Sequence, residues 1–349
     1  MNIDLLKRLC ETPGVPGRED RVRILIEKEI EGLFDEVSTD PLGNLIARRK
    51  PRGGSGEAKK VMLLCHMDEI GFLVSHIDDK GFVYVDPVGG FDTRNLFSRR
   101  VLLITDEGEY KAVMNPGGRP VHIASPEDKT KVPETKEFFI DLGVDAETVK
   151  KRVKIGDYVV MDEPLIEVGE KVVSKALDNR VACWLGIEAI RRLAELGGDH
   201  ACEIVVSFTV QEEVGLRGAK TSSYAVKPDI GIGIDVTLSC DTPGVPAHEA
   251  VSRQGEGVVV HIKDSSFISD AGLVRDFEAV AKEHNITHQR SILARGGQDG
   301  AAAQQAAAGA RAIGITVGTR YIHTVTEMID KRDLNAAREL LARYLAALK

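Results

Sequence analysis

The 349-residue sequence has few cysteines, few aromatic residues and no long apolar run. Its five cysteines, an odd number, are scattered without the paired spacing of a disulfide framework or a cysteine-based zinc cluster. Phe, Trp and Tyr make up 5% of the residues, which is little for the stacking surfaces of a sugar-cleaving site. No apolar run is long enough to cross a membrane. These absences favour an ordinary globular protein with reduced, buried thiols.

The chain also lacks an excess of positive charge. Its net charge is -8 and its pI is about 5.7, and no basic stripe with interleaved aromatics is present, so we expect no nucleic-acid partner. The first residues, "MNIDLLKRLCETPG", include acidic side chains and predict a short amphipathic helix. A secretory signal would instead need a basic start and an apolar core. We therefore expect a cytoplasmic protein without a membrane partner.

The hydrophobic pattern changes twice along the chain. Residues 1–69 predict two helices and then two strands, 45–50 and 61–69. Between about 70 and 167, short strand-like pieces alternate with Gly, Pro and Asp turns, which is typical of a small β-barrel or sandwich. From 168 the chain returns to alternating helices and strands. We predict a three-layer α/β/α domain made of residues 1–69 and 168–349, interrupted by an all-β domain at 70–167.

The periodicity of the last part places its elements. It predicts helices at 179–196, 270–284, 299–309 and 333–348, and strands at 203–211, 230–235, 257–263 and 311–317.

Several predicted strands end in side chains that can bind a metal ion. The carboxyl ends of strands in an open α/β sheet line one crevice, so residues from different strands meet there. Imidazoles and carboxylates together are typical ligands of zinc and similar divalent ions. The candidates are His66, Glu212, Glu213 and Asp235 at strand ends, Asp178 at a helix start, and His323 in the loop after the last strand.

Each candidate has a simpler interpretation when it is taken alone. Asp178 could cap its helix, His66 could be a hydrogen-bonded histidine at a strand end, Asp235 could form a turn, and His323 could be a loop residue. Glu212 and its neighbour are harder to explain in this way. A carboxylate at the end of a buried strand needs a cation or hydrogen-bond donors to offset its desolvation.

Six segments in this order, "HMDEIGF", "KALDNR", "QEEVGLRGA", "GIDVT", "CDTPG" and "YIHT", extend the pattern over nearly the whole chain. Together they resemble the tetrahedral metallo-aminopeptidases, a family that includes glutamyl aminopeptidases and proteins often labelled endoglucanase. The resemblance implies an enzyme that releases N-terminal amino acids from short peptides. It also implies two divalent metal ions per subunit, with zinc as the first choice and cobalt as the alternative.

The resemblance assigns roles residue by residue. His66, Asp178 and Asp235 would hold one ion, while Asp178, Glu213 and His323 would hold the other, so that Asp178 bridges the pair.

Glu212 would then be the general base for a water between the two ions. Neighbouring residues of an extended chain point in different directions, so its neighbour Glu213 can bind a metal while Glu212 faces the water. Asp68 would accept a hydrogen bond from the second nitrogen of His66 and fix its tautomer.

In the family that the chain resembles, the β-rich insertion pairs subunits into dimers that build a tetrahedral dodecamer, so we expect the same self-association here. Two segments depart from the family pattern. Gln298 stands where a small hydroxyl residue is usual, and the segment around His122 matches only loosely. The histidines without a motif are interpreted as surface or packing residues; they are His76, His200, His248, His261, His284 and His288.

Two other functions remain open at this point. Paired acids also cleave glycosidic bonds, although histidines beside the acids and the low aromatic content argue against a glycoside hydrolase. An assembly protein that has lost catalysis would keep the fold, but it would not need all six metal and base positions. The preferred N-terminal residue, acidic or aliphatic, is not predicted by the sequence.

Overall fold

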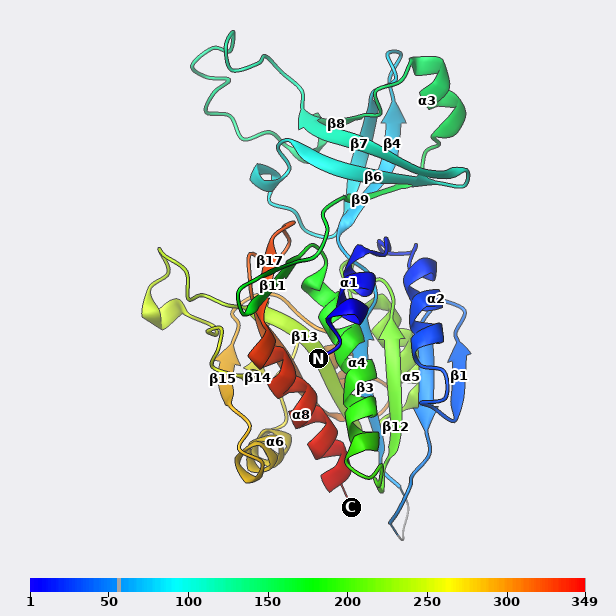
Figure 1. The fold of residues 1–349 in the computed structure, drawn as a ribbon, viewed down its shortest axis with the longest axis vertical. Helices are drawn as coiled ribbons and strands as arrows, with labels where there is room; N and C mark the ends of the chain where they lie inside the picture. The colour runs from blue at the N-terminus through cyan, green and yellow to red at the C-terminus, as the bar shows by residue number, and fades with distance from the viewer. Residues whose placement is uncertain (55–57, 349) are drawn as a thin grey trace.

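The computed structural model describes residues 1–54 and 58–348 and has two parts, each built on its own sheet (Figure 1). In the described residues, eleven strands form one large sheet and β4 to β9 close into a barrel. The chain enters the barrel after β3 and leaves it after β9. The α/β class with an inserted β domain is therefore confirmed. We keep 70–167 as the proposed bounds of the insertion, since β4 begins at Gly71 and β9 ends at Met161.

The centre of the large sheet is parallel. Strands β12, β3, β13 and β16 are parallel neighbours, so their carboxyl ends lie along one edge. The full order is β1-β2-β12-β3-β13-β16-β17-β11-β10, and β14 pairs with both β16 and β15. The bounds are β1 Glu36–Thr39, β2 Leu45–Arg49, β3 Lys60–His66, β10 Ile166–Val168, β11 Lys171–Ser174, β12 Glu203–Thr209, β13 Ile230–Leu238, β14 Val258–Lys263, β15 His288–Ile292, β16 Arg311–Arg320 and β17 Glu327–Asp330.

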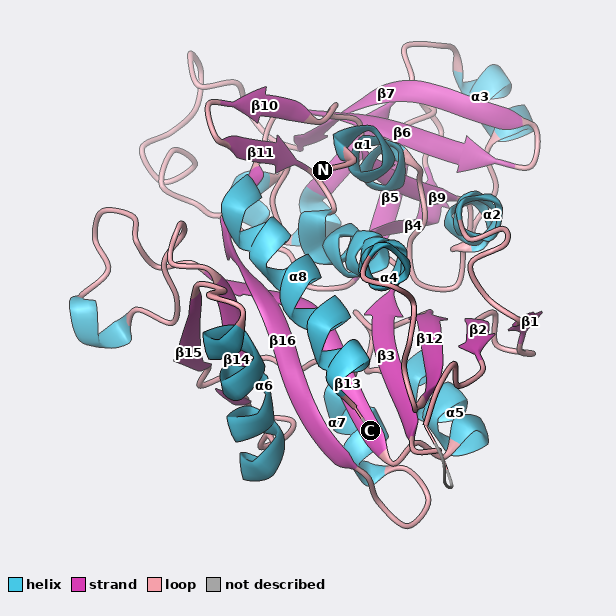
Figure 2. Cartoon of the chain, turned by 60° about the horizontal axis from the view of Figure 1, so that its bottom comes forward, coloured by secondary structure: helices cyan, strands magenta, loops and turns pink. Residues whose placement is uncertain are grey.

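Helices cover both faces of this sheet (Figure 2). Alternate side chains of β3 divide between the faces: Leu63 and Cys65 join the larger core, while Met62 and Leu64 join the smaller one. The larger core packs under α1 Ile3–Glu11, α2 Asp20–Glu29, α4 Leu177–Glu195, α6 Ala271–Glu283 and α8 Lys331–Ala347, and the smaller under α5 Arg217–Val226 and α7 Gly300–Gln305.

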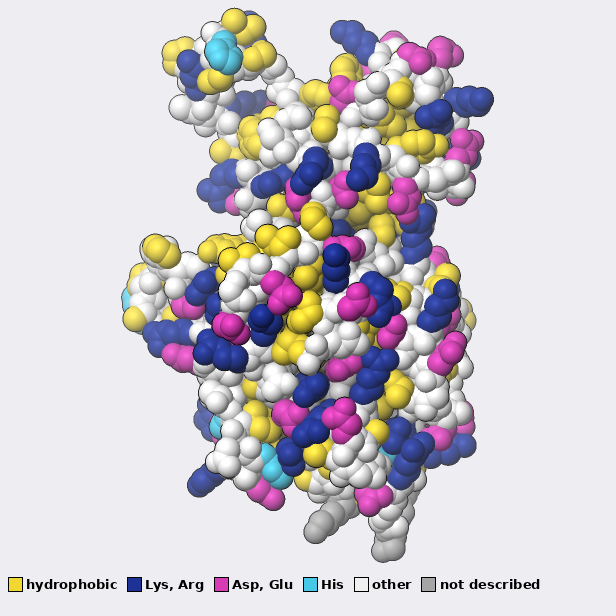
Figure 3. All heavy atoms as spheres, viewed as in Figure 1, with side chains coloured by type: hydrophobic (Ala, Val, Ile, Leu, Met, Phe, Trp, Pro, Cys, Tyr) yellow, Lys and Arg dark blue, Asp and Glu magenta, His cyan; other side chains and the backbone are white. Residues whose placement is uncertain are grey.

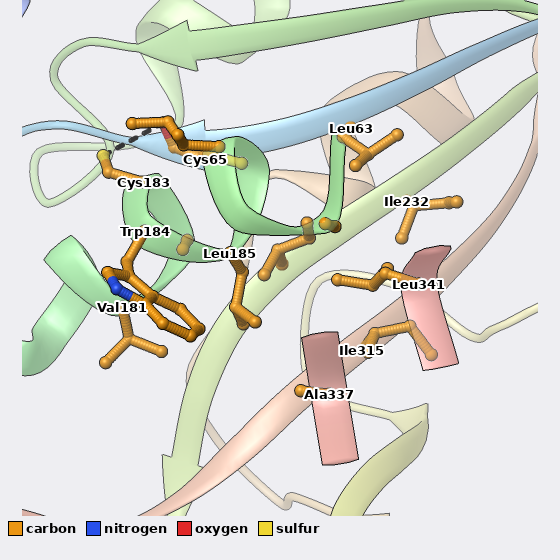
Figure 4. Close-up of a cluster of buried hydrophobic side chains, with 14 of the residues drawn as sticks. Leu63, Cys65, Val181, Cys183, Trp184, Leu185, Ile232, Ile315, Ala337 and Leu341 are labelled. Carbon is orange, nitrogen blue, oxygen red and sulfur yellow. Dashed lines mark hydrogen bonds between the residues drawn. The ribbon is translucent and has the colours of Figure 1, made fainter. Parts of the chain in front are cut away.

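Figure 4 shows part of the larger core, where Leu63, Ile232 and Ile315 of the sheet share one cluster with Leu185 of α4 and Leu341 of α8. The predicted three layers are therefore present.

The barrel has its own core. Its closed order is β4-β5-β8-β7-β6-β9, and alternate residues of β6, Val101 and Leu103, pack inside with Phe72 and Phe138. Its bounds are β4 Gly71–Ile77, β5 Val83–Val88, β6 Arg99–Thr105, β7 Gly108–Pro116, β8 Phe138–Asp141 and β9 Tyr158–Met161. One α-helix, α3 Ala146–Arg152, lies in the described part of this segment, which the sequence predicted to be an all-β domain.

Some predicted elements differ from the observed ones. Helix α7 ends at Gln305 instead of 309, because Ala307 has a left-handed φ of 51° and the chain turns there to enter β16. Helix α5 and the short strands β15 and β17 were not predicted. Among the residues described, no helix has both the length and the apolar character needed to cross a bilayer.

Candidate active site

The candidate residues lie at the carboxyl edge of the four parallel strands. His66 is the last residue of β3, and Asp235 lies within β13. The sequence predicted that Glu212 and Glu213 end a strand. Strand β12 ends earlier, at Thr209, so both residues lie in the loop after it.

The remaining two come from the start of α4 and from the loop after β16. They are Asp178 and His323. Together these residues line a cavity of about 800 Å³ that extends to Gly90, Phe91 and Asp92 of the inserted domain.

Asp178 joins two groups of ligand atoms. Its Oδ1 lies 3.3 Å from Nε2 of His66, and its Oδ2 lies 3.4 Å from Nε2 of His323. Asp178, His66 and Asp235 form one set of donor atoms that all lie within 4.8 Å of one another. Asp178, His323 and Glu213 form a second such set. One carboxylate therefore faces two sites, each with one imidazole and a second carboxylate.

A third set of nearby donor atoms contains Glu212. It consists of His66, Glu212 and Glu213, and Oε2 of Glu212 lies 3.8 Å from Nε2 of His66. The structure thus brings all six predicted residues together.

Asp178 does not cap helix α4. Asp178 and Asn179 both have non-helical backbone angles, and the side-chain oxygen of Asn179 accepts the N–H of Ala182, as an N-cap residue does. Because Asn179 performs the capping, the Asp178 carboxylate is free to face the two imidazoles.

Asp68 holds the loop that carries the two glutamates. It is fully buried, and its two carboxylate oxygens accept the main-chain N–H groups of Glu212 and Glu213, each at 3.0 Å. Nδ1 of His66 lies 3.5 Å from the Asp68 carboxylate but only 3.1 Å from its main-chain oxygen. The closer acceptor for this imidazole is therefore the carbonyl of Asp68, where the sequence suggested the carboxylate.

Glu327, which sequence reasoning missed, holds the main chain of two other candidate residues in the same way as Asp68. It is 2% exposed, and its two oxygens accept the N–H groups of Asp178 at 2.9 Å and of His323 at 2.8 Å. Two buried carboxylates thus fix the backbones of four of the candidate residues. A single glutamate in "VTEMID" offers no pattern by which the sequence could have marked it.

The site carries more negative than positive charge. Burial raises the pKa of Glu212 and of Asp235 well above the ordinary range, and burial followed by the charge of Asp178 raises the pKa of Glu213. Burial also tends to raise the pKa of Asp178, but its interactions with His323 and His66 outweigh burial, so the pKa of Asp178 is lowered. Burial tends to lower the pKa of His323, but Asp178 and Glu213 outweigh burial and raise this pKa to about 12.

Two buried basic residues near the site, Lys175 and Arg180, do not balance this charge. Lys175 and Arg180 both pair with Glu69, with Nζ of Lys175 at 2.6 and 2.8 Å from its oxygens. The buried carboxylates around Asp178 therefore call for additional positive charge. Divalent ions with a preference for imidazole nitrogen and carboxylate oxygen fit this donor set.

The model of the family described as M42 glutamyl aminopeptidase matches residues 43–340. The chain belongs to this family.

Proteins with similar sequence and structure agree with that membership. The lysyl aminopeptidase of Pyrococcus furiosus is 32% identical, over 99% of this chain and 97% of its own. An aminopeptidase of Desulfurococcus kamchatkensis has a TM-score of 0.92 at 35% identity, covering 99% and 95% of the two chains. The Pyrococcus horikoshii TET1 peptidase, which can assemble into a tetrahedron or a large octahedral shell, has a TM-score of 0.87 at 29% identity and covers 99% of both chains.

Membership in the M42 aminopeptidases makes the chain a peptidase, and the resemblance read from its six segments is confirmed. The family is described by a glutamyl activity and the Pyrococcus furiosus relative by a lysyl one. The family alone therefore does not determine the preferred N-terminal residue.

Three further residues named in the sequence analysis lie in different places in this M42 peptidase: two are in the cavity wall and one is on an exposed loop. Gln298 is 4% exposed and lines the cavity, so its side chain contributes to the cavity wall. His122 is exposed on the loop between β7 and β8. His261, which we interpreted as a packing residue, is buried in the cavity wall with Nε2 3.4 Å from Asp264.

Proposed function

We propose that the protein is a dinuclear metal-dependent aminopeptidase that removes single residues from the N-termini of short peptides. The observation that carries the proposal is the position of Asp178, whose two oxygens face two different imidazoles at 3.3 and 3.4 Å. A carboxylate placed in this way suits a ligand shared by two cations.

Two sets of residues would hold the cations. His66, Asp178 and Asp235 form one set, and Asp178, Glu213 and His323 form the other. Zinc suits these nitrogen and oxygen ligands, and cobalt is the alternative. When bound, a pair of divalent cations polarises the scissile carbonyl and lowers the pKa of water.

Glu212 is the general base in this proposal. The two sets that share Asp178 use five residues and leave Glu212 over, beside the same imidazole of His66. Its carboxylate takes a proton from the water that adds to the scissile carbonyl. The same proton then passes to the leaving nitrogen as the C–N bond breaks, which gives a free amino acid and a peptide that is one residue shorter.

Asp68 acts through the groups it holds. Its two hydrogen bonds fix the main chain of Glu212 and Glu213, and its carbonyl lies beside Nδ1 of His66. A base and a ligand on adjacent residues can point at different targets only while this main chain keeps one conformation.

We also propose that the chain self-associates through the inserted domain into a dodecamer built from dimers. The barrel contributes none of the proposed metal ligands, and its loop between β7 and β8 projects from the molecule with apolar side chains on its surface (Figures 1 and 3). Val121 and Ile123 on this loop are 63% and 70% exposed. The Pyrococcus horikoshii TET1 peptidase, similar over 99% of both chains, provides the precedent for such assembly.

Chelation and metal replacement test the proposed chemistry. We expect a strong chelator to abolish hydrolysis of aminoacyl arylamides, and zinc or cobalt ions to restore it with about two ions bound per subunit. A panel of arylamides with acidic, basic and aliphatic residues would identify the preferred N-terminal residue. Full activity after complete metal removal would contradict the proposal.

A further inference from the structure

Four consecutive main-chain N–H groups, from Val210 to Glu213, donate to side chains from distant segments. Val210 donates to Oδ1 of Asn44, Gln211 to Oε1 of Glu19, and the next two residues to Asp68, all at 3.0 Å. Strand β12 has ended, so these N–H groups have no strand partner. The conformation of the loop that carries Glu212 and Glu213 therefore depends on three buried side chains.

Gln211 is the residue in this loop that most needs support. Its φ of 55° lies in the left-handed region, which is unfavourable for a residue other than glycine. Glu212 and Glu213 follow this turn directly. The N–H of Gln211 donates to Glu19, which lies in the N-terminal segment, outside residues 43–340 that the family model matches.

Glu19 is placed as a buried acceptor rather than as a surface charge. It is 5% exposed, and its Oε1 also accepts the N–H of Gly17 at 2.8 Å. In the described residues no basic side chain forms a salt bridge with it. Burial, followed by the charge of Asp68, raises the pKa of Glu19 to about 7.

The two ordinary explanations for Glu19 do not apply. It occupies the N-cap position of α2, but its side chain makes no capping hydrogen bond to that helix. Among the residues that the structure describes, it forms no ion pair that would stabilise the fold either. Its carboxylate instead accepts the N–H groups of Gly17 in its own segment and of Gln211 in the turn before Glu212.

We infer that Glu19 is a positioning residue that holds the Gln211 peptide and so aims Glu212 at the reacting water. The inference rests on the proposed function of Glu212 as the general base. Either protonation state of Glu19 has an oxygen that can accept the Gln211 N–H, so the hydrogen bond, and not the charge, is the working feature.

The same N-terminal segment supports the other side of the loop. The carbonyl of Gly14 accepts the N–H of Glu69, next to Asp68, at 2.9 Å. Arg180 ties this segment to α4 through Nη1, which donates to the carbonyl of Thr12 at 2.7 Å. A displacement of residues 14–19 would therefore reach both loops that frame Glu212.

Two substitutions of Glu19 separate positioning from general stability. Glu19→Met keeps the length and the apolar stem but accepts no N–H. Because misplacement of a catalytic group by about 1 Å can cost about a hundredfold in rate, we expect kcat to fall about ten- to a hundredfold. We expect KM to stay within about threefold and the metal to be retained, while the melting temperature falls by about a few degrees because two buried N–H groups lose their acceptor. Glu19→Gln keeps the acceptor, and its kcat should stay within about threefold of wild type, with the same pH profile.

Asp20→Asn is the matched control. Asp20 is the next residue, its side chain is 73% exposed, and its partner is Arg23 on the same helix. This variant should match wild type in every assay.

Amide hydrogen exchange of the peptide around residues 205–217 gives a second result that needs no catalysis. Exchange in this peptide should be faster in Glu19→Met than in wild type, and unchanged in Glu19→Gln. Wild-type kcat with Glu19→Met, equal damage by both substitutions, or loss of metal or fold in Glu19→Met would overturn the inference. Unchanged exchange in Glu19→Met would overturn it too. Failure of the proposed function would instead appear as an inactive wild type, and the exchange data would still decide the role of Glu19.

Discussion

Glu212→Gln tests the proposed base with little change of shape. The side chain is 11% exposed, and an amide has nearly the same volume as a carboxylate, so we expect no cavity. The five proposed ligands are untouched, and Asp68 still accepts the main-chain N–H of residue 212. The amide cannot take a proton from water.

General base catalysis contributes about 10²- to 10⁴-fold, so kcat should fall by this factor, equal to about 3–5 kcal/mol of transition-state free energy. Arylamide hydrolysis and metal content should be measured on the same preparation. Glu203→Gln is the control, since Glu203 lies at the other end of β12 and pairs with Arg48. A fully metallated Glu212→Gln variant with near wild-type kcat would refute the assignment.

Three further predictions concern the shared ligand, a surface ion pair and the assembly. Asp178→Ala should lose metal as well as activity, because one carboxylate faces both imidazoles; full metal occupancy measured by elemental analysis would contradict the dinuclear site. Arg320 lowers the pKa of Asp241 to about 2, so this pair stabilises the fold above the usual Asp pKa of about 4 and loses its effect as pH falls through about 2. Asp241→Asn should therefore lower the free energy of unfolding by about 1–2 kcal/mol at pH 7, and its melting temperature should approach that of wild type in acid. Light scattering should give a dodecamer mass at micromolar concentration; a fully active particle of monomer mass would show that the insertion only covers the site.

The sequence allowed the candidate residues at strand ends to be predicted because an imidazole or carboxylate there ends a buried apolar run. The buried run of β3 stops at His66, and that of β12 stops shortly before two carboxylates. Parallel neighbours bring such ends together whatever the details of the loops. The convergence of these residues on one cavity follows from strand order, which alternating helices and strands indicate well.

The residues that hold the site were harder to predict. Glu327 and Glu19 act through hydrogen bonds from side chain to main chain, and these leave no periodic trace in the sequence. Glu19 stands at the start of a helix, where an acidic residue is common and draws no attention. Helix α5, "RGAKTSSYAV", is rich in residues with modest helix propensity and begins after Leu216, whose φ is 56°, so local patterns did not predict it.

The buried acids of this site fall into two kinds with different electrostatic needs. Asp68 and Glu327 each accept two main-chain N–H groups, which offsets part of the desolvation of a carboxylate. Asp235 receives one N–H, from Val236, and the carboxylates of Glu212 and Glu213 receive none among the described residues. Among these five acids, the three with the fewest donors are the ones that line the cavity. Negative charge without donors at a buried edge is costly unless a cation lies nearby, so the hydrogen-bond pattern supports the proposal that Asp235, Glu212 and Glu213, rather than Asp68 and Glu327, meet the metal ions, water and substrate.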